Sequence, residues 1–263
     1  MNIIVCIKQV PETTEVKINP ETKTLMREGV ASIINPFDMY AIEEGLRLRE
    51  AKGGKVTVLT MGPPQADSAL RASISMGVDE VVLLSDRAFA GSDTLATSYT
   101  LSSAIRKIAS YDLVICGKQA SDGDTAQVGP GIAQCLNIPF VTYVKKIEEI
   151  SAEKKYMRVE KMTDEGYEII EMSLPALITV VKEINEPRLE SLRGKMRARS
   201  AQIPVWTAAD ICADPNRTGL AGSPTQVIKI FTPPGRGKGE IFEGDAETAV
   251  DKLVARLREK KIV

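Results

Sequence analysis

The stretch best suited to chemistry is residues 116–130, CGKQASDGDTAQVGP, which is rich in small and polar residues. It follows the apolar run 112–116, typical of a buried strand, and a helix is predicted to begin within residues 124–127. In an open α/β sheet, ligands gather at the carboxyl ends of strands, and helix N-termini attract phosphate. The stretch matches neither G-x-G-x-x-G nor a P-loop, so an ordinary loop capped by Asp124 is the alternative to a nucleotide site.

Two other predicted strands end in residues of the same kind. Lys8 follows the apolar run 3–7, where a phosphate or ribose lies in a doubly wound sheet, although a solvated loop lysine explains it equally well. Met61 and Gly62 end a second strand and lead into a helix predicted over residues 66–76. Because several such turns fall on strand ends, together they favour a nucleotide site more than any one does alone.

A proline sets the start of the first predicted helix. Pro36 disfavours helical backbone at Asn35, so the helix is predicted to begin after Pro36, with Asp38 as its N-cap. Asn35 has two readings, a helix cap or a hydrogen-bond partner for a ligand, and capping is the commoner role.

Composition removes several classes of catalyst. The 263 residues include no histidine, which excludes Ser-His-Asp and Cys-His catalysis and the commonest metal ligand. The four cysteines are widely spaced, so free thiols in a reducing compartment are expected rather than iron–sulfur or zinc sites. Catalysis by Lys, Asp or Glu stays open.

Charge and hydropathy predict a cytoplasmic protein. A formal net charge of −1 gives no global attraction to nucleic acid or to membrane surfaces. The longest apolar stretch, residues 174–181, is far shorter than the ~20 residues of a membrane-spanning helix. The N-terminal apolar run has no basic region before it and does not read as a signal peptide.

The elements that must position these residues alternate regularly. Over the first ~145 residues, β-branched runs alternate with helical patterns, which is typical of a parallel sheet covered on both faces. Period-two patterning then predicts an antiparallel meander at about residues 143–175. The predicted fold class is α/β, a Rossmann-like, doubly wound, mostly parallel sheet with an antiparallel meander and an extended C-terminal arm. The expected strands lie at residues 3–7, 55–61, 80–84, 112–116, 138–141, 143–150, 156–161, 167–172 and 176–181.

A basic segment follows the last of these strands. Residues 188–199 contain five basic residues and one acidic residue, and Leu189, Leu192 and Met196 are spaced to share one helical face. The region at about residues 185–200 is predicted to be a partner-recognition loop in which a leucine enters a partner's pocket. A basic surface helix packed on its own domain is the alternative, and nucleic-acid binding is a weak third.

The predicted domain boundary lies before residue 225. Residues 1–224 are expected to form the nucleotide-binding domain, and residues 225–263 an arm with an extended segment, a Gly- and Pro-rich linker and an amphipathic helix over 245–260. Such an arm suggests wrapping around a partner, and a helix docked on its own domain is the alternative.

Together these features resemble the β subunit of electron-transfer flavoproteins over essentially the whole chain. Four blocks carry the resemblance: VCIKQV at residues 5–10, NPFD with AIEE at 35–44, GKQA onward at 117–130, and NEPR at 185–188. A family signature of the form V-x-K-x-x-D-E-G-x-E-x-I-x-x-x-x-P is read from Val159 to Pro175.

The resemblance implies an αβ heterodimer in which this chain binds an adenine nucleotide. That nucleotide is AMP in the plain electron carriers and a second FAD in the electron-bifurcating members. The basic segment is similar to the family's recognition loop, with Leu192 docking on the partner dehydrogenase. The cofactor-binding residues predicted from strand ends and resemblance together are Cys6, Lys8, Asn35, Pro36, Phe37, Asp38, Met61, Gly62, Ala120, Asp122, Gly123, Asp124, Thr125, Ala126, Gln127, Val128, Gly129, Pro130 and Gly131.

Three segments are similar to the bifurcating members: MGPPQA at 61–66, SDRAFA at 85–90 and DGDTAQVGP at 122–130. The resemblance therefore implies FAD, with NAD(H) as electron donor, and the subgroup associated with caffeyl-CoA reductase in acetogens is the nearest fit. The implied partners are the α subunit, ferredoxin, and an acyl-CoA dehydrogenase- or reductase-like flavoenzyme or a lactate dehydrogenase. The chain is not expected to be an enzyme alone. Two alternatives stay open, a non-bifurcating carrier subunit holding a structural AMP and, from the fold alone, an ATP-using domain of the universal stress type.

Overall fold

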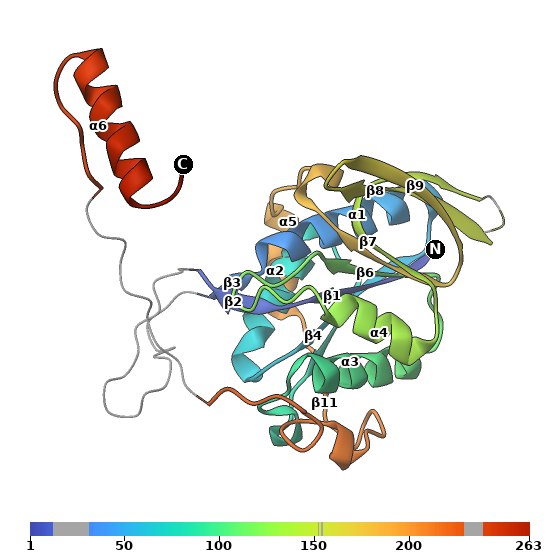
Figure 1. The fold of residues 1–263 in the computed structure, drawn as a ribbon. Coiled ribbons are helices and arrows are strands. Elements are labelled where there is room, and N and C mark those ends of the chain that lie inside the picture. Colours follow the sequence, from blue (N-terminus) through green and yellow to red (C-terminus); the bar gives the residue numbers. More distant parts are fainter. Residues whose placement is uncertain (13–31, 152, 154, 229–238) are drawn as a thin grey trace. The chain divides into compact units, whose positions relative to one another are not determined.

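The structure is a computed structural model that describes residues 1–12, 32–151, 153, 155–228 and 239–263 (Figure 1). It forms two compact units, Met1–Lys229 and Ile230–Val263, and each is described by itself. Most of the Gly- and Pro-rich linker lies outside the described residues.

The first unit is built on a nine-stranded sheet with the order β11-β5-β4-β1-β6-β10-β7-β8-β9. Every pairing from β11 to β7 is parallel, and the β7–β8 and β8–β9 pairings are antiparallel. The fold class predicted from the sequence is thereby confirmed. The strands are β1 (Asn2–Ile7), β4 (Lys55–Met61), β5 (Glu80–Leu84), β6 (Leu113–Gly117), β7 (Phe140–Ile150), β8 (Tyr156–Thr163), β9 (Gly166–Ser173), β10 (Ala176–Val180) and β11 (Val205–Trp206), with β2 (Gln9–Pro11) and β3 (Ser32–Ile34) forming a separate antiparallel pair.

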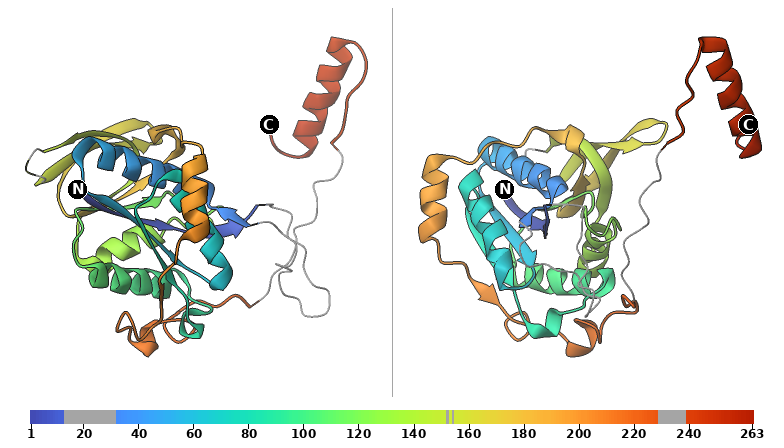
Figure 2. Two further views of the ribbon diagram at one scale, coloured as in Figure 1. Left: turned by 180° about the vertical axis from the view of Figure 1, so that it is seen from behind. Right: turned by 90° about the vertical axis from the view of Figure 1, so that its left-hand side faces the viewer.

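Helices cover both faces of this sheet (Figures 1 and 2). On the face of α1 and α2, Ile42 packs in one core with Ile3 of β1. On the face of α3 and α4, Ile105 and Ile132 pack in a second core with Ile4. Successive strand residues point to opposite faces, so the unbroken apolar run of β1 supplies both cores. The helices are α1 (Pro36–Lys52), α2 (Asp67–Met76), α3 (Thr94–Ile108), α4 (Val128–Leu136) and α5 (Leu192–Ser200), with short 3-10 turns η1 (Pro64–Ala66), η2 (Arg87–Phe89), η3 (Lys182–Ile184) and η4 (Pro215–Arg217).

The strand order reverses between β1 and β6. From β1 the chain winds outward through β4 to β5, and it then returns to β6 on the other side of β1. Cys6 and Cys116 are register partners at this junction, near the carboxyl ends of both strands. Open α/β sheets bind ligands at such a reversal, so the fold brings residues after β1 and β6 to the position a ligand would take.

Strand β7 joins the parallel sheet to the meander. The sequence predicted two strands, at 138–141 and 143–150, whereas the structure has one strand whose first part pairs with β10 and whose later part pairs with β8. The junction falls at Tyr143, which has a left-handed φ of 59° beside a register shift in the β10 pairing. An irregular residue bends a strand without ending it, which local patterning does not reveal.

The second unit contains α6 (Ala246–Glu259), which confirms the predicted terminal helix. Asp245 caps it, since its carboxylate accepts a hydrogen bond from the Thr248 N–H at 3.0 Å. Val250 and Leu253 are exposed on this helix. Among the described residues, no helix is both long and apolar enough to cross a membrane.

Candidate functional site

Asn35 joins the start of α1 to the loop after β6. Its side-chain amide donates to the Gln119 carbonyl at 2.8 Å, and its side-chain oxygen accepts from the Ser121 N–H at 3.0 Å. Its backbone N–H donates to the Lys8 carbonyl at 2.8 Å. Asn35 is the N-cap residue of α1 by position, but its side chain makes no capping bond. It therefore acts as a connector between the loops that follow β1 and β6.

Asp38 is buried directly beneath this connection. The prediction that it caps the helix is wrong, because α1 begins at Pro36 and Asp38 lies inside its first turn. Its carboxylate instead accepts from the Lys8 N–H at 2.7 Å. Burial raises the pKa of Asp38 to about 7, despite hydrogen bonds from Lys8, Asn35 and Gly117 that act the other way. The group therefore titrates near neutrality in a chain without histidine.

The loop from Ala120 to Gln127 is not helical, so the predicted helix start at 124–127 is wrong and α4 begins at Val128. Asp124 and Ala126 both have a left-handed φ of 55°, which a right-handed helix cannot include. Backbone that mixes right- and left-handed residues turns successive N–H groups toward one side and forms a concave anion site. The loop is thus suited to present N–H groups through its left-handed backbone, whereas the sequence predicted that a helix N-terminus at residues 124–127 would present them.

The first turn of α4 adds further donors. The N–H groups of Val128 and Gly129 have no partner within the helix, and their end of the helix dipole favours an anion. Close packing fixes this helix end: a Cβ at Gly129 would stand 2.5 Å from the Thr179 methyl group, and one at Gly131 would overlap Ser98. Both glycines are therefore required for α4 to lie against β10 and α3.

Two lysines flank the loop. The Lys8 ammonium lies 2.6 Å from the Asp122 carboxylate, so Lys8 reaches across the site while its side chain stays 49% exposed. Lys118, which sequence reasoning missed as a site residue, has its ammonium 5.6 Å from the Phe37 ring centroid and 4.9 Å from that of Tyr143. The sequence position that could have identified it is the one directly after β6, in the block Gly117-Lys118-Gln119.

The remaining predicted cofactor-binding residues lie on or after strands β1 and β4. Cys6 lies at the buried end of β1. Met61 ends β4, and Gly62 donates its N–H to the Leu84 carbonyl at 3.0 Å. The turn after Gly62 is linked to β2, because the Gln9 side chain donates to the Gln65 carbonyl at 3.1 Å.

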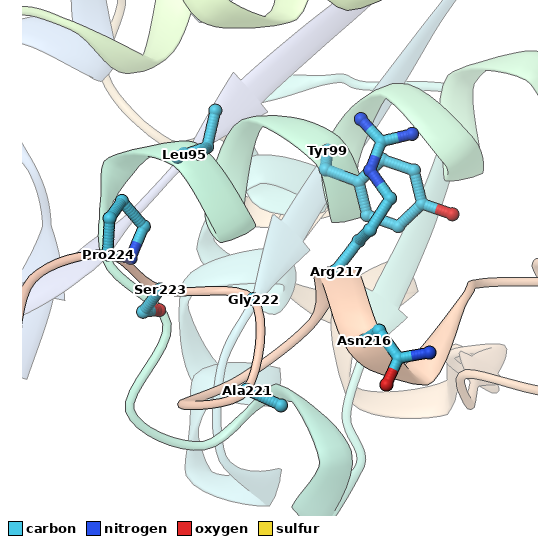
Figure 3. Close-up of a pocket in the computed structure, with 8 residues that line it drawn as sticks. All are labelled: Leu95, Tyr99, Asn216, Arg217, Ala221, Gly222, Ser223 and Pro224. Carbon is cyan, nitrogen blue, oxygen red and sulfur yellow. The ribbon is translucent and has the colours of Figure 1, made fainter.

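A cavity of about 420 Å³ lies beside α3, where Leu95 and Tyr99 face the loop of residues 216–224 (Figure 3). The Arg217 guanidinium stacks 4.0 Å from the Tyr99 ring centroid. None of the predicted cofactor residues lines this cavity. The predicted site is instead the open strand-end surface formed by the loops after β1 and β6.

The predicted recognition residues are exposed. Leu189, Leu192 and Met196 have exposed fractions of 91%, 78% and 66%. The expectation that all three share a helical face is wrong for Leu189, because Ser191 caps α5 and the helix begins at Leu192. Arg188 anchors the segment through ion pairs with Glu43 at 2.8 Å and Glu50 at 2.6 Å, both on α1.

Comparison with known proteins agrees with the resemblance read from the residues. Residues 22–211 match the family described as Electron transfer flavoprotein domain. The chain is 54% identical over 264 residues to an electron transfer flavoprotein subunit beta of Thermoanaerobacterium thermosaccharolyticum, with all of both chains covered. It is 51% identical over 265 residues to the caffeyl-CoA reductase-Etf complex subunit CarD of Acetobacterium woodii, again over all of both chains. Protein FixA of Azotobacter vinelandii is 46% identical over 265 residues, which cover 98% of this chain and 94% of that protein. The chain therefore belongs to the electron transfer flavoprotein family and is a β-type subunit of it.

Proposed function

We propose that this chain is the β subunit of an electron-bifurcating electron transfer flavoprotein in the cytoplasm. It binds FAD at the β1–β6 reversal and passes electrons from NADH to ferredoxin and, through the FAD of the α subunit, to an acyl-CoA dehydrogenase- or reductase-like partner. The observation that carries the proposal is the meeting of the Asn35 turn with the left-handed loop before α4. The similarity to a subunit named for a caffeyl-CoA reductase complex supports the bifurcating type.

The donor set fits a diphosphate. N–H groups of the loop and of the first turn of α4 would hold it, and the helix dipole adds to their attraction. Two carboxylates in the same loop would repel an anion; the Lys8 ammonium offsets the charge of Asp122, whereas Asp124 accepts a hydrogen bond from the neutral Gln119 amide and keeps its charge. The Lys8 side chain is 49% exposed, so its ammonium is also open to a phosphate oxygen while it stays paired with Asp122.

A bound FAD would supply the two-electron and one-electron redox chemistry that bifurcation needs. The chain's own residues would bind and orient the FAD. Asn35 holds the loop in place, α4 and Lys8 contribute positive potential, and Asp38, whose pKa burial raises to about 7, ties the Lys8 backbone to the start of α1. No histidine is required for these roles.

A nucleotide count on the purified αβ pair tests the proposal. Two FAD molecules per heterodimer are expected, one in each subunit. One FAD plus one AMP would instead establish the second candidate, a non-bifurcating carrier whose β subunit holds a structural AMP. Replacing Thr125 and Gln127 together by glutamate should lower the count by one, because added carboxylates repel the phosphates. An unchanged count would show that the nucleotide lies elsewhere.

A further inference from the structure

Two buried thiols lie side by side beneath the proposed nucleotide loop. Cys6 on β1 and Cys116 on β6 are register partners on adjacent parallel strands. Both belong to the core on the α3 and α4 face, so their side chains point the same way, and the Cys6 thiol is close enough to raise the pKa of the Cys116 thiol. Their exposed fractions of 7% and 6% leave only an edge of each residue open.

The spacing of the strands suits a disulfide that is under strain. Register partners on neighbouring strands have Cα atoms ~4.8 Å apart, within the roughly 4.4–6.8 Å that disulfides span. Their Cβ atoms are separated by about the same ~4.8 Å, whereas a relaxed disulfide places them about 3.8 Å apart. A bond here would pull the strand ends together and, being strained, would be readily reduced.

We propose that Cys6 and Cys116 form a reversible dithiol–disulfide site whose oxidation is controlled by occupancy of the nucleotide site above it. The control by nucleotide rests on the proposed function, whereas the pairing of the thiols does not. The oxidant is a peroxide, which is small enough to reach sulfurs that larger reagents cannot.

The oxidation balances in two steps. The Cys6 thiolate attacks one oxygen of hydrogen peroxide and the O–O bond breaks, which leaves a sulfenic acid on Cys6. The departing hydroxide takes up the proton that the thiol released and becomes water. Cys116 then attacks the Cys6 sulfur and displaces the hydroxyl group, so that two thiols and one peroxide give one disulfide and two waters. The neighbouring Cys6 thiol, together with burial, raises the pKa of the Cys116 thiol, and Cys6 is the attacking sulfur in this proposal.

The two strand ends support the site above. Lys8 follows β1 and donates its N–H to Asp38 at 2.7 Å, and Gly117 ends β6 where a Cβ would overlap the same carboxylate. A bond that draws Cys6 toward Cys116 therefore moves both neighbours of Asp38 at the start of α1. A nucleotide at the strand ends conversely covers both sulfurs and slows their oxidation.

The test uses the full chain in complex with its α subunit, stripped of nucleotide and carrying Cys135→Ser and Cys212→Ser. Hydrogen peroxide should link the peptides of Cys6 and Cys116, as mapped by mass spectrometry, and dithiothreitol should restore both thiols. FAD at ten times its Kd should slow the linkage about tenfold, because the open site is then about one-eleventh of the total. Adding Cys6→Ser should leave Cys116 reduced under the same treatment.

Three results separate the parts of the inference. If Cys6 and Cys116 stay reduced while a surface cysteine of the unsubstituted chain is oxidised, the two thiols do not form a disulfide and the inference fails. Linkage at one rate with or without FAD or AMP overturns the control by nucleotide. Protection by AMP and not by FAD sustains the inference and refutes the proposed cofactor.

Discussion

The Asn35→Ala substitution tests whether the connection between the two loops orders the proposed site. Asn35 is 1% exposed, and its side chain makes one hydrogen bond to Gln119 and one to Ser121. Each bond contributes about 1 kcal/mol net, and both partner groups are left partly buried without it, so the free energy of unfolding should fall by about 2–3 kcal/mol. Re-forming the loop without Asn35 on binding costs about one bond, ~1 kcal/mol, which raises the Kd for FAD about fivefold.

The assay combines guanidinium unfolding with titration of the stripped αβ complex with FAD. Asn2→Ala is the matched control, since the Asn2 amide makes an exposed side-chain bond to Ser110 at 3.3 Å. It should change the unfolding free energy by less than about 0.5 kcal/mol and leave the affinity for FAD unchanged. A destabilised Asn35→Ala variant that binds FAD with wild-type affinity would refute the reasoning, because Asn35 would then support the fold and not the site.

Three further predictions concern other parts of the molecule. The pKa of Asp38 rises from 3.8 in the unfolded chain to about 7 in the folded one, so between these values the folded state binds the Asp38 proton more tightly than the unfolded state does. The free energy of unfolding should therefore fall as pH rises from about 4 to about 7. Asp38→Asn should make that fall less steep, as measured by urea unfolding from about pH 4 to about pH 8. Gly129→Ala should destabilise by about 1–3 kcal/mol because its Cβ meets Thr179, whereas Gly123→Ala, with open space around it, should cost less than about 0.5 kcal/mol in the same thermal unfolding assay. Leu192→Ala should lower electron delivery to the partner flavoenzyme about tenfold or more while NADH oxidation by an artificial acceptor persists, since the side chain is 78% exposed.

Each of these has a contradicting outcome. A parallel pH dependence in Asp38→Asn and the unsubstituted chain would place the titrating group elsewhere. Equal stability of the two glycine variants would show that α4 can shift away from β10. Val205→Ala, at a residue that is 52% exposed on the edge strand β11, is the control for Leu192→Ala, and loss of both activities in the latter would indicate a folding role.

The sequence predicted the sheet well because its signals are local. Unbroken apolar runs such as 3–7 and 112–116 mark strands buried on both faces, and the turns after them mark the strand ends. Alternation of strands and helices then fixes handedness and parallel pairing. The convergence of the Lys8 and Gly117 regions follows from that topology, whereas Asn35 comes after the separate β2–β3 pair, which the sequence did not predict.

The errors concern partners that are distant in sequence or backbone that is locally unusual. Asp38 looks like an N-cap because its true donor, the Lys8 N–H, is 30 residues away. The predicted start of α4 is too early because Asp124 is a typical N-cap residue and Ala126 a strong helix former, whereas both adopt left-handed backbone in the structure. Lys118 escaped notice because the aromatic ring of Tyr143 reaches it from a strand that the sequence divided in two.

Helix α1 serves two regions that the chain separates by about 150 residues. Its N-terminal end, with Asn35 at the N-cap and Asp38 in the first turn, lies at the proposed nucleotide site. Glu43 and Glu50 farther along the helix hold Arg188 beside the exposed leucines. At 1.5 Å per residue, Glu43 stands about 12 Å along the axis from Asn35. If the proposed nucleotide and partner bind where these residues lie, the distance between the two binding regions is fixed by one continuous helix and not by a loop.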